Sequence, residues 1–543
     1  MAEWDGGAQV MIVGGRAGQW GLRNRELTPF GSLITLRNAT LEDVTWRTGA
    51  GATPIGSAIS GTPVIRVALD YWSDPDTQRT LVSCEDGTLR KGDQNADNWV
   101  TLASGLTVSG WVPMWVLGGG ERPGRAQKAF HADRGNAVRV LVADGATVAA
   151  IARPAPEWVS GNQPGWLAVD EWGHLWAGGT PTFQGAWRSL PEDQEDFLTR
   201  PYTLPVGSGI RRTTAALPYK GGLLVWGDPT GVWWFDLREA NDQLWRVHRV
   251  GSWGVPGPGC VVAAENDVVG LDAQGGVHLI SMTDPQGTPR SSDISARQLG
   301  SWIRENINRG QLVNAQLVWD GGRQKLSVGC HAIGQTQKNQ RIDLDLSQRD
   351  SLGERWLYWD ADRNEALFMR LVSGVLQPAF GDGAGRVWNL EQAARNRNGS
   401  GYTFEWFMRD TDLSEINPAW RGRDKNLRFL KLLYDARSQG THSVDIWRNG
   451  EKKQTVDFDL IAGAPTLPVT LPFTLGGETI QSSRPMRLYG QAERIALRGI
   501  STLADFDISI AGVMPSIRCA RSAACSTSSS RCAMMSTRRP AAT

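Results

Sequence analysis

The sequence predicts an all-β protein, in which a β-propeller of about six to eight blades is followed by an antiparallel β-sandwich. Glycine is unusually frequent, with 63 residues among 543 and no collagen period, so tight turns must be numerous. The 25 tryptophans fall within short apolar runs. Strand-like runs separated by Gly or Asp-Gly turns recur along most of the chain. At this length we expect either several domains or one large closed architecture with an appendage.

The clearest hairpin lies within residues 163–197. Trp166, Leu167 and Val169 lead into a turn at Gly173, and residues 175–177 return. Aromatic side chains can therefore pack across the two strands, as in an antiparallel pair.

Similar units fill residues 46–391, each with an apolar strand, a tight turn and a second strand. Asp86-Gly87 and Asp144-Gly145 are two-residue hairpin signals, and further turn signals stand at 221–222, 229–231, 266–267 and 275–276. With about 40–50 residues per blade, this span holds about seven or eight blades, or about six if the loops are long. A closed propeller hides its strand edges, which explains how so many short strands coexist.

These patterns predict four segments. Residues 1–45 form an N-terminal arm with a first strand, 46–395 form the propeller, and 396–515 form the sandwich, where Phe404, Trp406 and Met408 alternate. One helix is predicted within 295–310, bridging two blades on the rim. Residues 516–543 contain five arginines and no acid, and we expect a disordered basic tail. That composition also fits a shifted reading frame, and we assign the tail no function.

The charge balance and the cysteine spacing bear on whether the protein binds nucleic acid, forms disulfides, holds zinc or is exported. The balance of 57 Lys+Arg against 56 Asp+Glu gives no overall electrostatic case for nucleic-acid binding, although it leaves room for a local basic face. The six cysteines form no C-x-x-C pair, so neither a disulfide framework nor a zinc site is indicated, and synthesis in a reducing compartment fits best. The N-terminus lacks a signal-peptide pattern and no apolar run reaches membrane-spanning length, so we expect no export signal and no membrane segment.

Catalytic and metal-binding motifs are mostly absent. The zinc-protease, nucleophile-elbow and P-loop patterns do not occur, and the six histidines stand singly. The stretch around Asp272 resembles a quinoprotein blade turn once, and Asp360 to Asn364 has the opening of a calcium loop without its completion. We interpret each as a hairpin turn and expect a protein that is not an enzyme and has no cofactor and no metal.

Three stretches carry a resemblance to a known family. They are LTPFGSLITLRNAT at 27–40, the run from Asp70 to Val82, and the segment from GHLWAGG to EDQEDF within 173–197. Together they resemble propeller-type virion proteins of tailed bacteriophages, found in the tail or at the head-to-tail junction and similar to nozzle proteins. The resemblance implies a structural component that is synthesised in the host cytoplasm, forms a homo-oligomeric ring, binds other virion proteins, and lines or closes the DNA path.

Five basic residues are candidates for contact with DNA phosphates or with a partner, without reading base sequence. They are Arg211, Arg212, Arg421, Arg423 and Lys425. A solvated basic turn is the simpler interpretation of each. The alternative function is a carbohydrate-active or glycan-binding propeller, and a carbohydrate-active one would need paired acids at the mouth of the ring.

Overall fold

The structure is a computed structural model of the chain. It describes residues 8–9, 33–42, 45–118, 127–190, 193–197, 202–203, 211–228, 230–239, 241, 245–281, 287–295, 299–350, 353–360, 364–393, 395–414, 418–436, 438–460, 481–482, 486–502 and 507–519.

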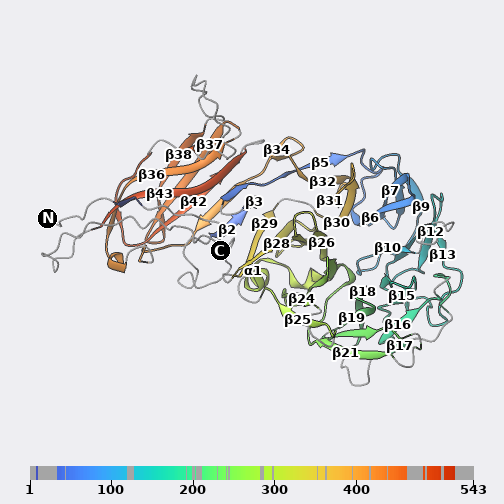
Figure 1. Cartoon of the computed structure of the whole chain (residues 1–543). Helices are drawn as coiled ribbons and strands as arrows, with labels where there is room; N and C mark the ends of the chain where they lie inside the picture. Colours follow the sequence, from blue (N-terminus) through green and yellow to red (C-terminus); the bar gives the residue numbers. More distant parts are fainter. Residues whose placement is uncertain are drawn as a thin grey trace, which may run out of the picture.

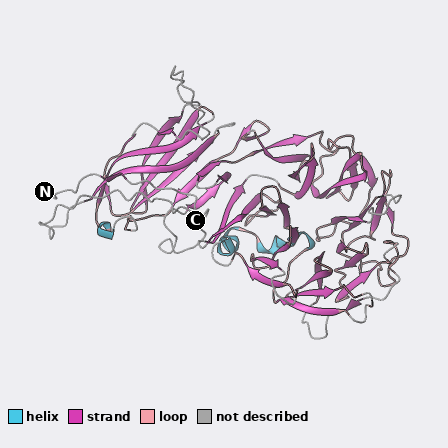
Figure 2. Cartoon of the chain, in the orientation of Figure 1, coloured by secondary structure: helices cyan, strands magenta, loops and turns pink. Residues whose placement is uncertain are grey.

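Strands make up most of the described residues, and only short helical segments lie between them (Figure 2). In the described part, five separate sheets each contain four consecutive antiparallel strands. These sheets are β6–β9 (Ile65–Asp74, Thr77–Cys84, Leu89–Gly92, Val100–Ala103), β10–β13 (Met114–Gly118, Lys128–Ala132, Arg139–Val142, Ala149–Ala150), β14–β17 (Trp166–Val169, Leu175–Gly178, Gly185–Arg188, Tyr202–Thr203), β18–β21 (Arg212–Pro218, Gly222–Asp228, Val232–Asp236, Arg246–Gly251) and β22–β25 (Val261–Ala264, Asp267–Leu271, Val277–Ser281, Arg290–Asp293).

Two further groups of four strands belong to larger sheets. The first is β26–β29 (Gln316–Asp320, Lys325–Cys330, Gln340–Asp350, Gly353–Asp360). The second joins β30–β32 (Ala366–Val372, Val375–Gly381, Val387–Gln392) to β5 (Gly51–Ile55), and the short β33 (Asn396–Arg397) and β34 (Ser400–Gly401) extend it. Since β5 pairs antiparallel with β32, a strand from near the N-terminus completes the last group.

The seven groups follow one another around a ring. The first strand of each group lies against the first strand of the next, in the order β6, β10, β14, β18, β22, β26 and β30, and β30 lies against β6 again. Figure 1 shows the same path, from the blue strands through green to yellow. The structure therefore confirms an all-β, propeller-like fold.

Four hairpin turns share one hydrogen-bond pattern. In each, one aspartate oxygen accepts the backbone N–H groups two and four positions later, and the residue three positions later has a positive φ, as in hairpins with a left-handed third residue. The aspartates are Asp93, Asp170, Asp272 and Asp382, and the left-handed residues are Ala96, Gly173, Gly275 and Gly385, with φ of 51°, 83°, 87° and 71°.

The second carboxylate oxygen often binds a buried ring in the following strand. Asp170 and Asp382 accept the indole N–H groups of Trp176 and Trp388, each at 2.8 Å. His278 Nε2 takes the equivalent place at 2.9 Å from Asp272. The stretch that resembles a quinoprotein turn is therefore one of a set of structural turns, in agreement with the hairpin interpretation.

Replacing Asp170 by Ala should destabilise the β14–β15 hairpin. The change leaves the backbone N–H groups of Trp172 and His174 and the buried indole N–H of Trp176 without their carboxylate acceptor, at an expected cost of about 2–3 kcal/mol. Thermal unfolding and hydrogen exchange of β14–β15 measure the effect. Asp193→Ala is the control, because Asp193 accepts one exposed backbone N–H, and equal losses in the two variants would refute this role of Asp170.

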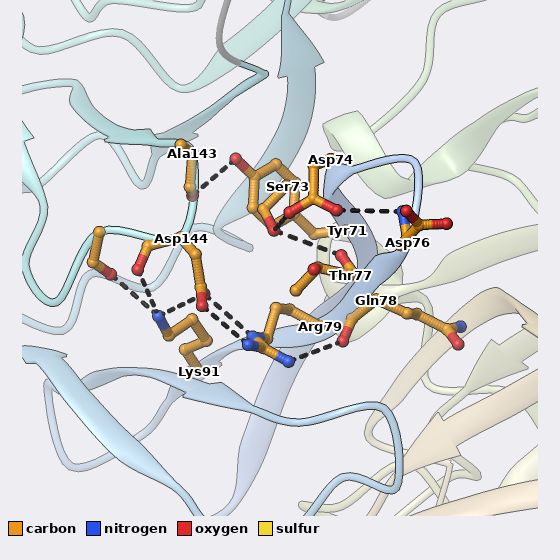
Figure 3. Close-up of polar contacts among 11 residues, drawn as sticks. Tyr71, Ser73, Asp74, Asp76, Thr77, Gln78, Arg79, Lys91, Ala143 and Asp144 are labelled. Carbon is orange, nitrogen blue, oxygen red and sulfur yellow. Dashed lines mark hydrogen bonds and ion pairs between the residues drawn. The ribbon is translucent and has the colours of Figure 1, made fainter.

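The β6–β7 hairpin is tied to both neighbouring groups. On one side, Gln78 Nε2 donates to Asp70 at 2.8 Å and to the Leu371 carbonyl at 2.8 Å, across the junction of β6 with β30. On the other side, Arg79 binds Asp144 through two hydrogen bonds of 2.9 and 2.7 Å (Figure 3). Lys91 Nζ also contacts Asp144, at 2.6 Å. The Asp144-Gly145 turn therefore joins the second ring group to the first.

Arg79, followed by Lys91, lowers the pKa of the Asp144 carboxyl to about 2. Because this pKa is lower in the folded state than the ordinary value near 4, the ionised carboxylate stabilises the folded protein above about pH 4. This stabilisation is lost as the pH falls from about 4 to about 2. Asp144→Asn should cost about 1–2 kcal/mol at neutral pH, because the side chain is 39% exposed and solvent screens the pair. Thermal midpoints at pH 2–7 measure the difference from the unsubstituted protein, which should shrink toward pH 2. Asp76→Asn, in the exposed tip of the β6–β7 hairpin, is the control, and a difference independent of pH would contradict the assignment.

A β-sandwich adjoins the ring. One of its sheets continues from β29 through β2 (Leu33–Arg37), β35 (Phe404–Met408), β42 (Ile495–Ser501), β37 (Gly440–Arg448) and β38 (Glu451–Leu460). The other contains β3 (Ala39–Glu42), β4 (Thr45–Thr48), β43 (Ile508–Cys519), β36 (Lys425–Ala436) and the short β1 (Ala8–Gln9), β39 (Gln481–Ser482), β40 (Met486–Arg487) and β41 (Gln491–Ala492). The predicted face of Phe404, Trp406 and Met408 is buried in the core between them.

The domain boundaries differ from the predicted ones at both ends of the chain. Residues 33–42 and 45–48 belong neither to an arm nor to the propeller, because β2, β3 and β4 pair with sandwich strands and bury Leu36 and Trp46 in their core, whereas β5 belongs to the ring. β43 continues to Cys519, which pairs with Lys425, so the sandwich does not end at 515. The rest of the predicted tail, 520–543, lies outside the described residues.

The predicted helix ends earlier than the pattern suggested. α1 spans Leu299–Asn306 between β25 and β26, and its Trp302 ring packs 5.2 Å from Trp356. Gly310 lies in a following 3-10 turn, Arg309–Asn314. The two remaining 3-10 turns of the described chain are Pro258–Cys260 and Pro418–Trp420.

Candidate functional site

A cavity of about 610 Å³ lies where loops from several ring groups converge. Its lining includes Trp111 before β10, Gly161 before β14, Pro256 before β22 and Val313 before β26. Because the first strands form the inner wall of the ring, the loops that precede them meet at one end of it. We call this cavity the ring-mouth pocket, and its polar side chains are Ser109, Trp111, Arg134, Arg212 and Asp228.

Burial and a hydrogen bond hold the Trp111 side chain in place in the pocket. It is only 4% exposed, and its indole N–H donates to the Gly165 carbonyl at 2.7 Å. Two guanidinium groups lie against its ring, with the Cζ atoms of Arg134 and Arg212 at 4.9 and 5.3 Å from the ring centroid. Cation–π contacts of this kind hold planar guanidinium groups in place while leaving their edges free to donate.

The charges in the pocket are incompletely balanced. Arg212 forms an ion pair with Asp228 at 3.2 Å. Arg134 forms no ion pair with any carboxylate in the described part of the chain. Burial, and then the neighbouring Arg212, lower the pKa of Arg134. The described lining of the pocket therefore contains two guanidinium groups and one carboxylate, that of Asp228.

The backbone of Arg134 is held in an uncommon conformation. Its φ is 64°, and its N–H donates to the Pro164 carbonyl at 3.0 Å. Asp133 fixes the same turn by accepting the N–H groups of Gly135 and Asn136. Non-glycine residues in the left-handed region cost about 1–3 kcal/mol and concentrate at binding sites. The turn therefore fixes the backbone from which the Arg134 side chain extends to Trp111.

A second polar centre links the last two ring groups. Lys325 in β27 binds Asp343 in β28 at 2.9 Å and Glu391 in β32 at 2.7 Å. Burial alone would raise the pKa values of both carboxyls, but the nearby cations Lys325 and Arg341 outweigh it and lower them. A cavity of about 480 Å³ borders these residues. The arrangement is a buried ionic cross-link between two sheets.

Ion pairs continue from this cavity into the sandwich. Arg395, which lines the cavity, lies 3.5 Å from Asp507 and donates to the Thr48 carbonyl at 3.2 Å. Arg47 also binds Asp507, with Nε at 2.7 Å. Since Thr48, Arg47 and Asp507 belong to the sandwich, these contacts fix it to the ring.

The five predicted contact residues have different environments. Arg212 lines the ring-mouth pocket, and Arg211 is exposed beside it. Arg421 is exposed and Arg423 half-buried in a sandwich loop, so the structure does not bring them together with the first pair. The interpretation of Lys425 as a contact residue was wrong. Its side chain is 0% exposed and donates to the carbonyls of Arg423 and Glu493, at 2.7 and 2.8 Å.

The hairpin interpretation of the calcium-like pattern that begins at Asp360 was wrong, because β29, which ends at Asp360, and β30, which follows it, belong to different sheets. The Asp360 carboxylate binds Arg37 and Asn38, each at 2.9 Å, and so joins β29 to β2. Asp362 lies outside the described residues. No group of three or more His, Cys, Asp or Glu side chains in the described ranges is placed to hold a metal ion. No helix in those ranges is long and apolar enough to cross a membrane.

Sequence reasoning missed Trp111 and Arg134. Nothing near either residue forms a motif, because the pocket is assembled from loops far apart in the chain. The positive φ of Arg134 has no signal in the sequence, where the usual indicators are Gly, Asn or Asp.

No family model matches the sequence, and no curated protein matches it either. Solved structures that are similar to the chain include the computationally designed Ika8 protein, at 11% identity and a TM-score of 0.34 over 63% of this chain and 100% of that one. Another is BBS1N in complex with ARL6DN, at 11% identity and a TM-score of 0.40 over 63% and 96%. A third is a chain of the mitotic checkpoint complex, at 10% identity and a TM-score of 0.37 over 61% and 91%. At these TM-scores we base no argument on the likenesses.

Proposed function

We propose that the chain is a structural component of a tailed-phage particle, at the tail or the head-to-tail junction. In this role it scaffolds neighbouring virion proteins and lines or closes the DNA path after synthesis in the host cytoplasm. We also infer that the body is a closed ring of seven blades, one for each group of four strands. The proposed location in a phage particle is supported by the resemblance to such proteins of three stretches, residues 27–40, 70–82 and 173–197.

The observation that supports a mechanical role best is the joint between ring and sandwich. The nine-stranded sheet runs from ring strand β29 through β2 into the sandwich. β33 lies parallel to β5, with Arg397 opposite Ala52, so the chain enters and leaves the ring at the same sheet. A load applied to the sandwich would therefore reach the strand that closes the ring.

The alternative, a carbohydrate-active propeller, requires two carboxyl groups flanking the scissile bond. The lining of the ring-mouth pocket offers one carboxylate, Asp228, which is already paired with Arg212. The pocket therefore gives that alternative no support.

Mass photometry of the full chain over a range of concentrations, together with negative-stain electron microscopy, tests the proposal. We expect ring-shaped multimers in which each subunit shows a round body and an elongated appendage. A species that stays monomeric at all concentrations, and that hydrolyses or binds glycans in a screen, would contradict the virion role.

A further inference from the structure

We propose that the ring-mouth pocket is a binding site for a phosphate group, held between Arg134 and Arg212. The inference rests on the geometry of the pocket and is independent of the virion role. It names a chemical class of ligand that the pocket's charges, shape and rigidity favour.

The first argument is charge. Two guanidinium groups lie against one indole ring, and Asp228 is the single carboxylate among the described residues of the lining. Arg212 forms an ion pair with it, whereas Arg134 forms no ion pair with a carboxylate in the described part of the chain. A bound anion would offset the repulsion between the two arginines, and the half-buried position would strengthen its hydrogen bonds.

The second argument is geometry. The Cζ atoms of both arginines lie over the Trp111 ring, and a guanidinium group in a cation–π contact can still donate N–H groups to another ligand. Arg134 comes from the β11–β12 turn and Arg212 from the start of β18, two different sheets. One carboxylate presents two coplanar oxygens and satisfies one guanidinium. A phosphate group has tetrahedrally arranged oxygens and can accept from both.

The third argument is size and rigidity. A volume of about 610 Å³ falls in the range of sites for organic ligands and exceeds what a lone ion needs. The buried Trp111 and the left-handed turn at Arg134 fix the donors in advance, which reduces the entropy lost on binding. The ligand is therefore a phosphate carried on a larger molecule.

Isothermal titration calorimetry of the full chain at constant ionic strength tests the site. The probes are inorganic phosphate, a nucleoside monophosphate and a short single-stranded oligonucleotide, with acetate as the carboxylate comparison. We expect saturable binding of at least one phosphate probe and weaker binding of acetate. Binding of the monophosphate alone would assign a small-molecule ligand, whereas tighter binding of the oligonucleotide would assign a phosphodiester backbone.

Substitutions separate a built site from general surface charge. Arg134→Gln and Arg212→Gln should each weaken phosphate binding about tenfold to hundredfold, because each removes charge-assisted hydrogen bonds. Asp228→Asn should strengthen binding several-fold, because it frees Arg212 from a competing carboxylate. Arg428→Gln, exposed in β36 of the sandwich, is the matched control and should leave binding unchanged.

The strengthening by Asp228→Asn distinguishes ligand binding from a purely structural role of these residues, since loss of the ion pair by itself gives no gain in affinity. The proposal is overturned if the unsubstituted protein shows no saturable phosphate binding. It is also overturned if Arg134→Gln and Arg428→Gln reduce binding equally. Neither result would bear on multimer formation, so the two proposals fail independently.

Discussion

Replacing Ala52 by Asp should open the ring at its last group. Ala52 is fully buried in β5, in a core with Val318, Phe380, Trp388 and others. An aspartate there would place an unpaired charge in an apolar environment and separate β5 from β32, at an expected cost of about 4 kcal/mol or more. Hydrogen exchange should show lost protection in β5 and β30–β32, together with a lower thermal midpoint of the full chain.

Thr53→Asp is the matched control for this substitution. Thr53 is the next residue of β5, half-buried on the opposite face, and gains the same charge. We expect it to cost less than half as much. If Ala52→Asp left the exchange of β30–β32 unchanged, β5 would not be the strand that closes the ring.

Replacing Asp343 by Ala should produce the second large effect, in the ionic cross-link between the last two ring groups. The carboxylate accepts the Trp359 indole N–H and the Ser327 hydroxyl, each at 2.6 Å, and pairs with Lys325 at 2.9 Å. Removing it leaves Lys325 and the buried Arg341 with one anion fewer. Breaking a buried pair in this way costs about 3–5 kcal/mol. Urea unfolding measures the loss.

The pH dependence supplies a second measurement of the same cross-link. The pKa values of Asp343 and Glu391 are lowered in the folded state by Lys325 and Arg341, so their stabilisation is present above pH 4 to 5 and is lost on acidification through the lowered values. Ser327→Ala, which removes one neutral donor, should cost only about 1 kcal/mol. The account would be contradicted if Asp343→Ala and Ser327→Ala lowered the free energy of unfolding equally. It would also be contradicted if the loss caused by Asp343→Ala were the same at pH 7 and pH 3.

Local patterns were sufficient to predict much of the fold. The Asp86-Gly87 and Asp144-Gly145 signals each fall between paired strands, and the 166–178 hairpin has the expected partners. The alternation of Phe404, Trp406 and Met408 gave the correct buried face. These features are visible because turn geometry and strand period depend on neighbouring residues alone.

Long-range pairing could not be predicted in the same way. β2 looks like an ordinary first strand, yet its partners in β29 and β35 lie more than 300 residues away. Lys425 looks like part of a basic turn, but it begins β36 and its buried ammonium group donates to two backbone carbonyls. The ring-mouth pocket shares this property, because Trp111, Arg134 and Arg212 meet only when the ring closes.

A cryo-electron microscopy map of the full chain tests the central claim most directly. The account expects seven blades, with β5 as the outer strand of the last blade, and a sandwich held in one fixed orientation by the shared sheet through β2. A different number of blades, a last blade completed without β5, or a sandwich that varies in orientation from particle to particle would contradict it.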